Sequence, residues 1–425
     1  MEIAEYLRRD HGISLSLQQR EAVEETHGHI LLLAVPGAGK TTVLTARLAN
    51  LIVNQGADPA RIAALTFNRE SARDMTRRWG TLFGAICPAP AFSTIHSFCY
   101  GILREYAAGR GTRVPALLEG EKGDGVGRVV TAIYRELTGN YLSEDRLSDL
   151  VSALGYCVNM CLEQPDPELQ RLERAIPDLA AVRERYTAYK RERELMDFDD
   201  MLLFTHTALT RSQTLRERIR GRYDFILVDE AQDTSRIQHA ILRRIVGDDL
   251  LMVGDEDQSI YGFRGAYPQG LLDFFKTYPD GKLLKLEQNY RSTGAIVESA
   301  SRVIGQNQSR YAKEMRTDRP QGEAVQVLRD LTLEEEGGWV LRLLGELPPD
   351  KTCAVLYRTG VSGIGISHLL RKEGVLYTAH PSGLGYAGDH INREILSIMA
   401  LAADPSDVRA FGRCYYRLGC AIPKE

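Results

Sequence analysis

Two apolar segments that run directly into acidic and amide residues constrain the fold of this chain most strongly. Residues 225–235 read FILVDEAQDTS, and residues 251–266 read LMVGDEDQSIYGFRGA. Short apolar runs of this kind are typical of buried strands in a parallel sheet, and ligands of such sheets bind at the carboxyl ends of the strands. Both segments therefore predict strands that bring carboxylates and an amide to one face of an α/β domain.

Similar apolar runs recur along the chain, and each is followed by a helical pattern. They lie at 29–35, 61–67, 224–230, 250–256 and 282–288. Strand signals disappear between about 106 and 190, and a second α/β pattern with strands at 322–329 and 352–359 follows later. The predicted organisation is a first α/β domain at 1–105 and 191–285, a helical insertion at 106–190, a partial second α/β domain at 286–403, and the start of a second insertion at 404–425.

Composition narrows the class of protein. The 425 residues are enough for two or three domains that each bury a core. No apolar run approaches the roughly 20 residues of a membrane span, and the N-terminal segment MEIAEYLRRDHGIS lacks the apolar core of a signal peptide. Seven scattered cysteines fit a reducing cytoplasm. The net charge of −4 requires that any nucleic acid be held by a local basic groove.

One pair of cysteines has a spacing that occurs in metal sites. Cys157 and Cys161 form a CxxxC pair, but no second pair of suitable spacing accompanies it. A metal role is therefore disfavoured, and the pair is left without an assigned role.

A glycine-rich loop between a predicted strand and a predicted helix has the pattern of a phosphate-binding loop. Glycines allow backbone amides to approach phosphates, and the positive end of the following helix favours anions. Lys40 would contact the β and γ phosphates of ATP, and the Thr41 hydroxyl would ligate Mg²⁺. An ordinary glycine-rich turn is the alternative interpretation. The predicted nucleotide-binding residues of the loop are Pro36, Gly37, Ala38, Gly39, Lys40, Thr41 and Thr42.

The acidic strand ends predict the hydrolytic groups. Asp229 would hold Mg²⁺, and Glu230 would act as the general base for the attacking water. Gln258 is suited to sense the γ-phosphate from the next strand. Arg291, in the segment LEQNYRST, is the candidate for the cation that stabilises the transition state, and we expect it to enter from the second α/β domain. Solvated acidic strand ends and a surface arginine are the alternatives.

Aromatic side chains interleaved with polar and basic residues predict contact with nucleic acid. Exposed aromatic rings stack on bases at about 1 to 3 kcal/mol per base, whatever the sequence, while hydroxyls and arginines hold phosphates. Burial of these rings in the core is the alternative interpretation. The predicted DNA-binding residues are Thr66, Phe67, Asn68, His96, Ser97, Tyr261, Phe263 and Arg264.

These strings, taken in order, resemble the UvrD/Rep/PcrA family of superfamily 1 DNA helicases over most of residues 13–410. LSLQQREAV at 15–23 is similar to the Q motif of the family, and AVPGAGKT and LTFNRESARDM are similar to its motifs I and Ia. The further matching strings, in family order, are STIHSF, MDFDDML, VDEAQD, GDEDQSIYGFRGA, LEQNYRST and AVLYRT.

The resemblance implies two RecA-like P-loop NTPase domains, the second incomplete here, with a helical insertion in the first. It implies ATP-driven movement along single-stranded DNA in the 3′ to 5′ direction and separation of duplexes at junctions, in DNA repair or replication restart. It also implies that Gln19 reads the adenine, that Tyr290 stacks on it, and that Arg264 links the ATP and DNA sites. Phe67, Tyr261 and Phe263 would form pockets for bases, although the family often has tryptophan at position 263.

The later family elements, similar to TxHxxKGLE and YVAxTRA, are absent from these 425 residues. The second arginine that the family directs to the γ-phosphate is therefore missing, and we expect ATP and DNA to bind while turnover is weak. A non-catalytic, ATP-dependent DNA-binding or regulatory module is the alternative function. The intact Lys40, Glu230 and Gln258 argue against it.

Overall fold

The computed structural model describes residues 2–118, 125–379 and 390–419, and the predicted domain ranges that include 119–124, 380–389 and 420–425 lie in part outside them. The chain forms two compact units, Met1–Val325 and Gln326–Glu425. Residues 286–325 therefore belong to the first unit, whereas the sequence pattern placed them in the second α/β domain. The reason is that the strand at 282–286 pairs with the central strand of the first sheet, so the residues after it are held beside that sheet.

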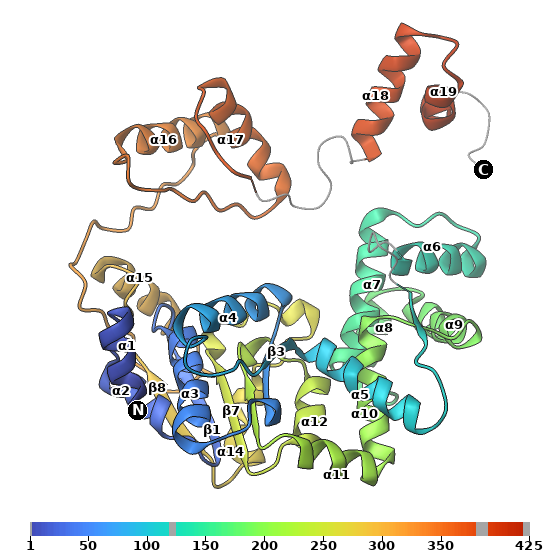
Figure 1. The fold of residues 1–425 in the computed structure, drawn as a ribbon. Coiled ribbons are helices and arrows are strands. Elements are labelled where there is room, and N and C mark those ends of the chain that lie inside the picture. Colours follow the sequence, from blue (N-terminus) through green and yellow to red (C-terminus); the bar gives the residue numbers. More distant parts are fainter. Residues whose placement is uncertain (1, 119–124, 380–389, 420–425) are drawn as a thin grey trace. The chain divides into compact units, whose positions relative to one another are not determined.

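A parallel six-stranded sheet organises the first unit (Figure 1). All five strands predicted in this part of the chain are formed, and a sixth, β3, escaped prediction because its four residues are only partly buried. β1 lies between β7 and β8, so the chain that follows each of these strands emerges at one edge of the sheet. The strand order is β3 (Ala91–Thr94), β2 (Ile62–Thr66), β6 (Phe225–Val228), β7 (Asp249–Gly254), β1 (His29–Ala34) and β8 (Lys282–Leu286).

Alternate side chains of the strands enter two separate cores. In β1, Ile30 and Leu32 pack into one core, whereas Leu31 and Leu33 pack into the other. Both faces are thus covered by helices, as a parallel sheet requires. The first core is covered by α1 (Ile3–His11), α2 (Leu17–Glu24), α3 (Lys40–Gln55) and α4 (Arg69–Leu82), and the second by α5 (Ile95–Gly109), α10 (Phe198–Arg211), α11 (Gln213–Arg222) and α12 (Arg236–Ile245).

A helical region lies between α5 and α10 in the sequence and has an apolar core of its own, which includes Val130, Leu150 and Val182. Two short parallel strands, β4 (Ala116–Leu117) and β5 (Leu195–Met196), pair where the chain enters and leaves it. Its helices are α6 (Gly125–Thr138), α7 (Glu144–Asn159), α8 (Pro167–Ala175) and α9 (Leu179–Glu192).

The strands predicted at 322–329 and 352–359 are not formed, and the described residues of the second unit contain helices alone. A strand forms only where its backbone groups pair with a neighbour, and Val327 and Leu356 are exposed instead of buried in a sheet. The helices of the second unit are α16 (Leu333–Glu346), α17 (Gly360–Lys372), α18 (His390–Ala403) and α19 (Val408–Cys414), and the first unit ends with α13 (Gln269–Leu272), α14 (Phe274–Thr277) and α15 (Gly294–Ile304). None of the described helices is long and apolar enough to cross a membrane.

His239 in α12 is buried, and its Nε2 atom has no hydrogen-bond partner. Burial, aided by Arg243, lowers the pKa of His239 from 6.5 to about 4. The unfolded chain therefore takes up a proton as the pH falls below about 6.5, while the folded protein does not. We expect His239 to reduce the free energy of unfolding by up to about 3 kcal/mol between pH 6.5 and pH 4. Denaturant titrations of wild type and His239→Leu across this range would show it, and equal pH dependence would contradict it.

Candidate nucleotide and nucleic-acid site

The loop after β1 has the conformation that its glycines allow. Gly37 and Gly39 adopt φ angles of +72° and +76°, in the left-handed region that favours glycine. Gly39 is the N-cap of α3, which begins at Lys40, so the loop leads directly into a helix N-terminus. Backbone amides and the helix dipole make this end of α3 suited to bind phosphate groups.

Lys40, Asp229 and Glu230 meet at the carboxyl edge of the sheet. The Nζ atom of Lys40 lies 2.5 Å from Glu230 Oε2 and 3.5 Å from Asp229 Oδ1. Burial opposes the charge of Lys40, but Asp229 and Glu230 outweigh burial and raise its pKa. Burial, opposed by Lys40 and aided by Glu230, raises the pKa of Asp229 to about 6. Burial also opposes the charge of Glu230, yet Lys40 lowers its pKa, so this carboxylate is ionised and able to accept a proton.

The backbone at Glu230 is strained. Its φ angle of +52° lies in the left-handed region, where a non-glycine residue costs of order 1 to 3 kcal/mol. Gln232 holds the side chain in place, because its Nε2 donates to Glu230 Oε2 at 2.7 Å and its Oε1 accepts from the Asp255 amide at 3.2 Å. This geometry presents the Glu230 carboxylate beside Lys40 in a single orientation.

A cavity of about 540 Å³ opens beside these groups and is lined by Thr41, Asp229, Glu230 and residues of α4 that include Arg73. Oxygen donors such as a hydroxyl and carboxylates are the ligands that Mg²⁺ prefers. Thr41 and Asp229 therefore fit a magnesium ion, which would neutralise phosphate charge when bound. Thr42 follows in the first turn of α3, where its carbonyl accepts from the Thr45 hydroxyl at 3.1 Å.

Gln258 does not point at Glu230 but donates from Nε2 to Asp255 Oδ2 at 2.7 Å. Asp255 in turn pairs with the ammonium of Lys313, a residue that sequence reasoning missed. Lys313 also lies 2.9 Å from Glu256 and 3.0 Å from Asp257, and its side chain is 3% exposed. The acidic run DED at 255–257 is the one sequence signal for a nearby buried cation. The run does not indicate which lysine or arginine supplies that cation.

The segment after β8 packs directly on the phosphate-binding loop. Asn289 Nδ2 donates to the Pro36 carbonyl at 2.8 Å, and the Tyr290 amide donates to the Gly37 carbonyl at 3.0 Å. A Cβ atom on Gly37 would lie 2.8 Å from Arg291 Cβ. Arg291 and the half-exposed Tyr290 thus come from the first unit. The compact unit that contains Arg291 is thus the first one, because β8 ties this segment to β1.

Gln19 also reaches this loop. Its Nε2 donates to the Ala38 carbonyl at 3.0 Å, while its Oε1 accepts from the Ser16 amide at 2.9 Å and so caps α2. The side chain of Gln19 is buried against the loop. Its position beside the loop is compatible with the predicted contact to a base.

Three aromatic side chains and one arginine form a cluster. Tyr261, Phe263 and Arg264 follow the acidic run at 255–257 in the chain, and Phe67 follows β2. The Phe67 and Tyr261 rings stack at 5.5 Å and 23°, and Phe263 lies 6.2 Å from Tyr261. The Arg264 guanidinium is 5.7 Å from the Tyr261 ring and 5.6 Å from the Phe263 ring. Phe263 is 65% exposed, so burial in the core does not explain it. A cluster with one exposed and two half-buried rings beside a cation is suited to stack on bases and hold phosphates.

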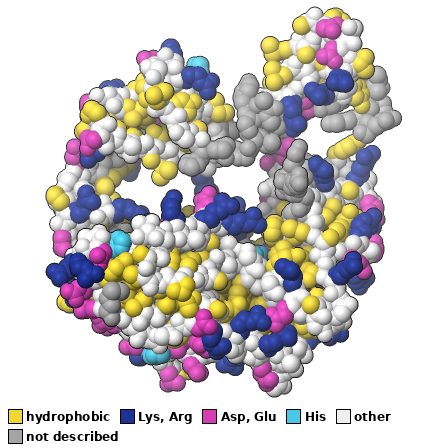
Figure 2. Space-filling model, in the orientation of Figure 1, with side chains coloured by type: hydrophobic (Ala, Val, Ile, Leu, Met, Phe, Trp, Pro, Cys, Tyr) yellow, Lys and Arg dark blue, Asp and Glu magenta, His cyan; other side chains and the backbone are white. Residues whose placement is uncertain are grey.

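The other predicted DNA-binding residues differ in exposure. Thr66 is fully buried, and its hydroxyl donates to the Asn68 carbonyl at 3.0 Å. Asn68 is exposed and caps α4. His96 lies 6.2 Å from the Phe198 ring, and burial lowers its pKa. Ser97 is exposed and accepts from the Thr94 hydroxyl at 3.0 Å. Figure 2 shows Lys and Arg side chains gathered where the α4 edge of the first unit lies.

Cys157 is buried and Cys161 is half-buried, and neither forms a disulfide. Burial raises the pKa of both thiols. Among the described residues, three potential metal ligands converge at Asp255, Glu256 and Asp257 alone, where Lys313 supplies the positive charge. Cys157 packs in a small apolar cluster with Met160, Leu162 and Leu169, whereas Cys161 packs against the second core of the sheet.

Two family models match the chain: the UvrD/REP helicase N-terminal domain over residues 15–279 and the UvrD-like helicase C-terminal domain over residues 284–425. The chain is 31% identical over 412 residues to the putative ATP-dependent DNA helicase YjcD of Bacillus subtilis, covering 94% of this chain and 53% of that protein. It is 32% identical over 416 residues to the ATP-dependent DNA helicase PcrA of Leuconostoc citreum, with coverage of 93% and 53%. The chain spans about half the length of the curated relatives it matches.

Proposed function

Because the chain belongs to the UvrD/REP helicase family, we propose that it is an ATP-dependent DNA helicase or its motor fragment, which couples ATP hydrolysis to movement along DNA. The observation that carries the proposal is the meeting of Lys40, Asp229 and Glu230 at the sheet edge. The aromatic cluster, in which Phe263 is exposed, lies in the segments that follow β2 and β7. Nucleotide chemistry and an aromatic nucleic-acid surface thus share one sheet.

In this proposal the triphosphate of ATP lies on the loop Pro36–Thr42, with its base near Gln19 and Tyr290. Lys40, which pairs with Glu230 in this structure, turns to the β and γ phosphates and leaves Glu230 to accept a proton from the attacking water. Arg291 packs against Gly37 and is placed to reach the phosphates. Arg264 lies against the aromatic cluster, next in sequence to the segment that carries Gln258, and links the two sites.

The finer features of the proposal rest on the family. They are 3′ to 5′ movement on single-stranded DNA, separation of duplexes at junctions, a place in DNA repair or replication restart, and action in the cytoplasm. We also propose that these 425 residues turn over ATP slowly, with Arg291, whose Cβ lies beside Gly37, as the candidate arginine for the phosphates.

ATP turnover with and without single-stranded DNA tests the proposal, with Lys40→Ala as the inactive reference. We expect turnover that DNA stimulates and that Lys40→Ala abolishes. Binding of ATP and DNA with no detectable turnover would favour the regulatory module instead. Failure to bind either ligand would overturn the proposal.

Removal of one exposed ring tests the DNA surface. Phe263→Ala is expected to weaken binding of a fluorescent oligothymidine about 5- to 100-fold, since one stacked base contributes about 1 to 3 kcal/mol. Nucleotide affinity should stay unchanged, because Phe263 does not contact the phosphate-binding loop. Tyr141→Ala removes an exposed ring of the helical region and serves as the control. Equal DNA affinity of wild type and Phe263→Ala would exclude Phe263 from the DNA site.

A further inference from the structure

The loop that carries the aromatic cluster rests on the end of α7. Gly265 ends the short 3-10 helix Gly262–Arg264 with a φ angle of +84°. A Cβ atom added there would lie 2.7 Å from Asn159 Cβ, closer than real Cβ atoms approach their neighbours. Gly265 therefore sits directly on Asn159, the last residue of α7. This position requires glycine both for its backbone conformation and for its close approach.

Asn159 is itself held from two sides. Its Nδ2 donates to Asp199 Oδ1 at 2.7 Å and to the Gly155 carbonyl at 3.0 Å. Asp199 also approaches Gly155 closely, since a Cβ atom there would lie 2.9 Å from Asp199 Oδ2. The amide of Asn159 thus has one orientation, fixed by a carboxylate from the first turn of α10.

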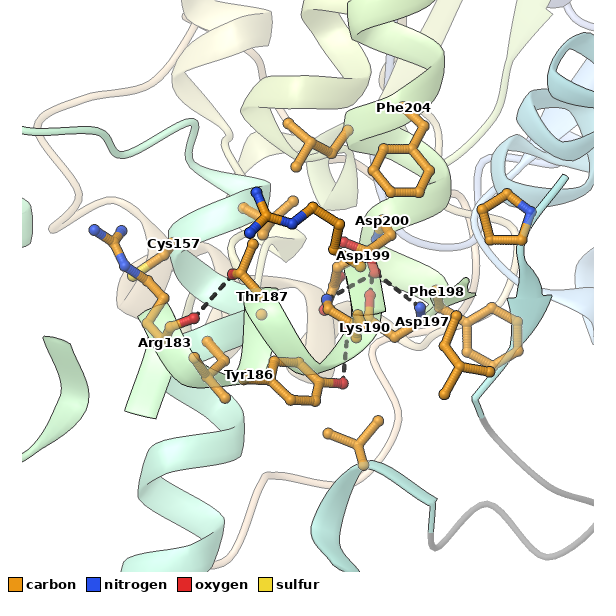
Figure 3. Close-up of a pocket in the computed structure, with 18 of the residues that line it drawn as sticks. Cys157, Arg183, Tyr186, Thr187, Lys190, Asp197, Phe198, Asp199, Asp200 and Phe204 are labelled. Carbon is orange, nitrogen blue, oxygen red and sulfur yellow. Dashed lines mark hydrogen bonds and ion pairs between the residues drawn. The ribbon is translucent and has the colours of Figure 1, made fainter. Parts of the chain in front are cut away.

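The first turn of α10 is anchored by a buried ion-pair cluster (Figure 3). Lys190, at the end of α9, lies 2.6 Å from Asp197 Oδ2 and 2.7 Å from Asp200 Oδ2. Tyr186 donates to Asp197 at 2.9 Å. Asp197 and Asp200 form the capping box at the start of α10, in which each carboxylate accepts from the backbone amide of the other. The neighbouring Asp199 is the carboxylate that accepts from Asn159. The cluster lies beside a cavity of about 2110 Å³ whose lining includes Arg264.

A second set of contacts ties the loop to the residues that follow Asp229 and Glu230. The Tyr267 amide donates to the Thr234 carbonyl at 3.0 Å, and Ser235 forms a β-bridge with Ala266. The aromatic loop is therefore held between the strand end that carries Glu230 and the end of α7.

We propose that Asn159, fixed by Asp199, is a positioning residue for the aromatic loop, so that the helical region sets the placement of Phe263 and Arg264 for single-stranded DNA. The inference rests on the proposed DNA-binding function. Asn159 makes no contact with DNA in this scheme, and it acts through Gly265. Asn159→Ala keeps the Cβ atom on which Gly265 rests but removes the hydrogen bond to Asp199 that holds the end of α7 against α10. The second support of the loop, at Thr234 and Ser235, stays intact.

The test measures oligothymidine affinity and nucleotide affinity of Asn159→Ala, with Asn140→Ala as a matched control. Asn140 is an exposed asparagine of the same helical region. We expect Asn159→Ala to weaken DNA binding about 5- to 10-fold, within the range of one lost base stack, and to leave nucleotide affinity unchanged. Asp199→Asn should bind DNA within about twofold of wild type, because an amide oxygen can still accept from Asn159.

A double-mutant cycle with Phe263→Ala separates positioning from general loss of structure. If Asn159 acts through the aromatic loop, Asn159→Ala has little further effect once Phe263 is removed. Additive effects, or full DNA affinity of Asn159→Ala, would overturn the inference while Phe263→Ala alone still supports the DNA site. If Asn159→Ala does not fold, Asp199→Ala removes the same contact and takes its place in the cycle. Unchanged DNA affinity of Phe263→Ala would instead count against the proposed function.

Discussion

Replacement of Lys313 by alanine is expected to destabilise the first unit by about 3 to 5 kcal/mol, the usual cost of removing one partner from a buried ion pair. The ammonium contacts Asp255, Glu256 and Asp257, and its side chain is 3% exposed. Its loss leaves the carboxylates close together in a buried site. Arg310, which lies 2.7 Å from Asp257, compensates only the outermost of them. Urea unfolding of the variant, followed by circular dichroism, measures the loss.

Lys276→Ala is the matched control, because its ammonium lies 2.6 Å from Asp273 but its side chain is 78% exposed. Exposed pairs contribute at most about 1 kcal/mol. The two variants therefore differ in burial and not in the kind of charge removed. Similar losses from both would mean that the carboxylates at 255–257 take up protons or water when Lys313 is absent.

Replacement of Glu230 by glutamine is expected to slow ATP cleavage by about 10²- to 10⁴-fold, the range that a positioned general base contributes. Glutamine keeps the size of the side chain but cannot accept the proton of the attacking water. Nucleotide binding should be retained, because a negative charge beside the phosphates is removed and Lys40 loses its 2.5 Å partner. Single-turnover cleavage with protein in excess over ATP measures this even where steady-state turnover is slow.

Glu70→Gln provides the control for that experiment. Glu70 is exposed on α4 and lines the same cavity as Glu230, but it does not contact Lys40. Cleavage within about twofold of wild type is expected for it, as for most exposed substitutions. Equal cleavage by wild type and Glu230→Gln would assign the general base to another group, of which Asp233 is the nearest carboxylate in sequence besides the Mg²⁺ candidate Asp229.

Local patterns predicted the groups that follow strands, because a strand end and a helix start are set by neighbouring residues. The loop Pro36–Thr42 and the pair Asp229–Glu230 lie where their flanking apolar runs placed them. Lys313 could not be predicted in the same way. It is separated from Asp255 by 58 residues, and nothing in the segment around it marks an ion pair with a distant acidic run.

Strand pairing explains where the structure departs from the sequence pattern. The apolar run at 282–288 does not show which strand it pairs with, and its pairing with β1 places Arg291 in the first compact unit. The runs at 322–329 and 352–359 have strand-like alternation but pair with no strand in the described residues. Apolar patterning predicts that a segment can be a strand, whereas pairing is settled by the rest of the fold.

The pairing of β8 with β1 also keeps the segment that packs on the loop at 36–42 within the first unit. The described contacts of the segment after β8 with the loop at 36–42, made by Asn289, Tyr290 and Arg291, all lie in the first unit, and residues 326–332 are exposed. A protease that cuts in this stretch would release a fragment with its nucleotide pocket whole. Inactivation by such a cut would then show that the residues after it are needed for activity but not for the contacts around this loop.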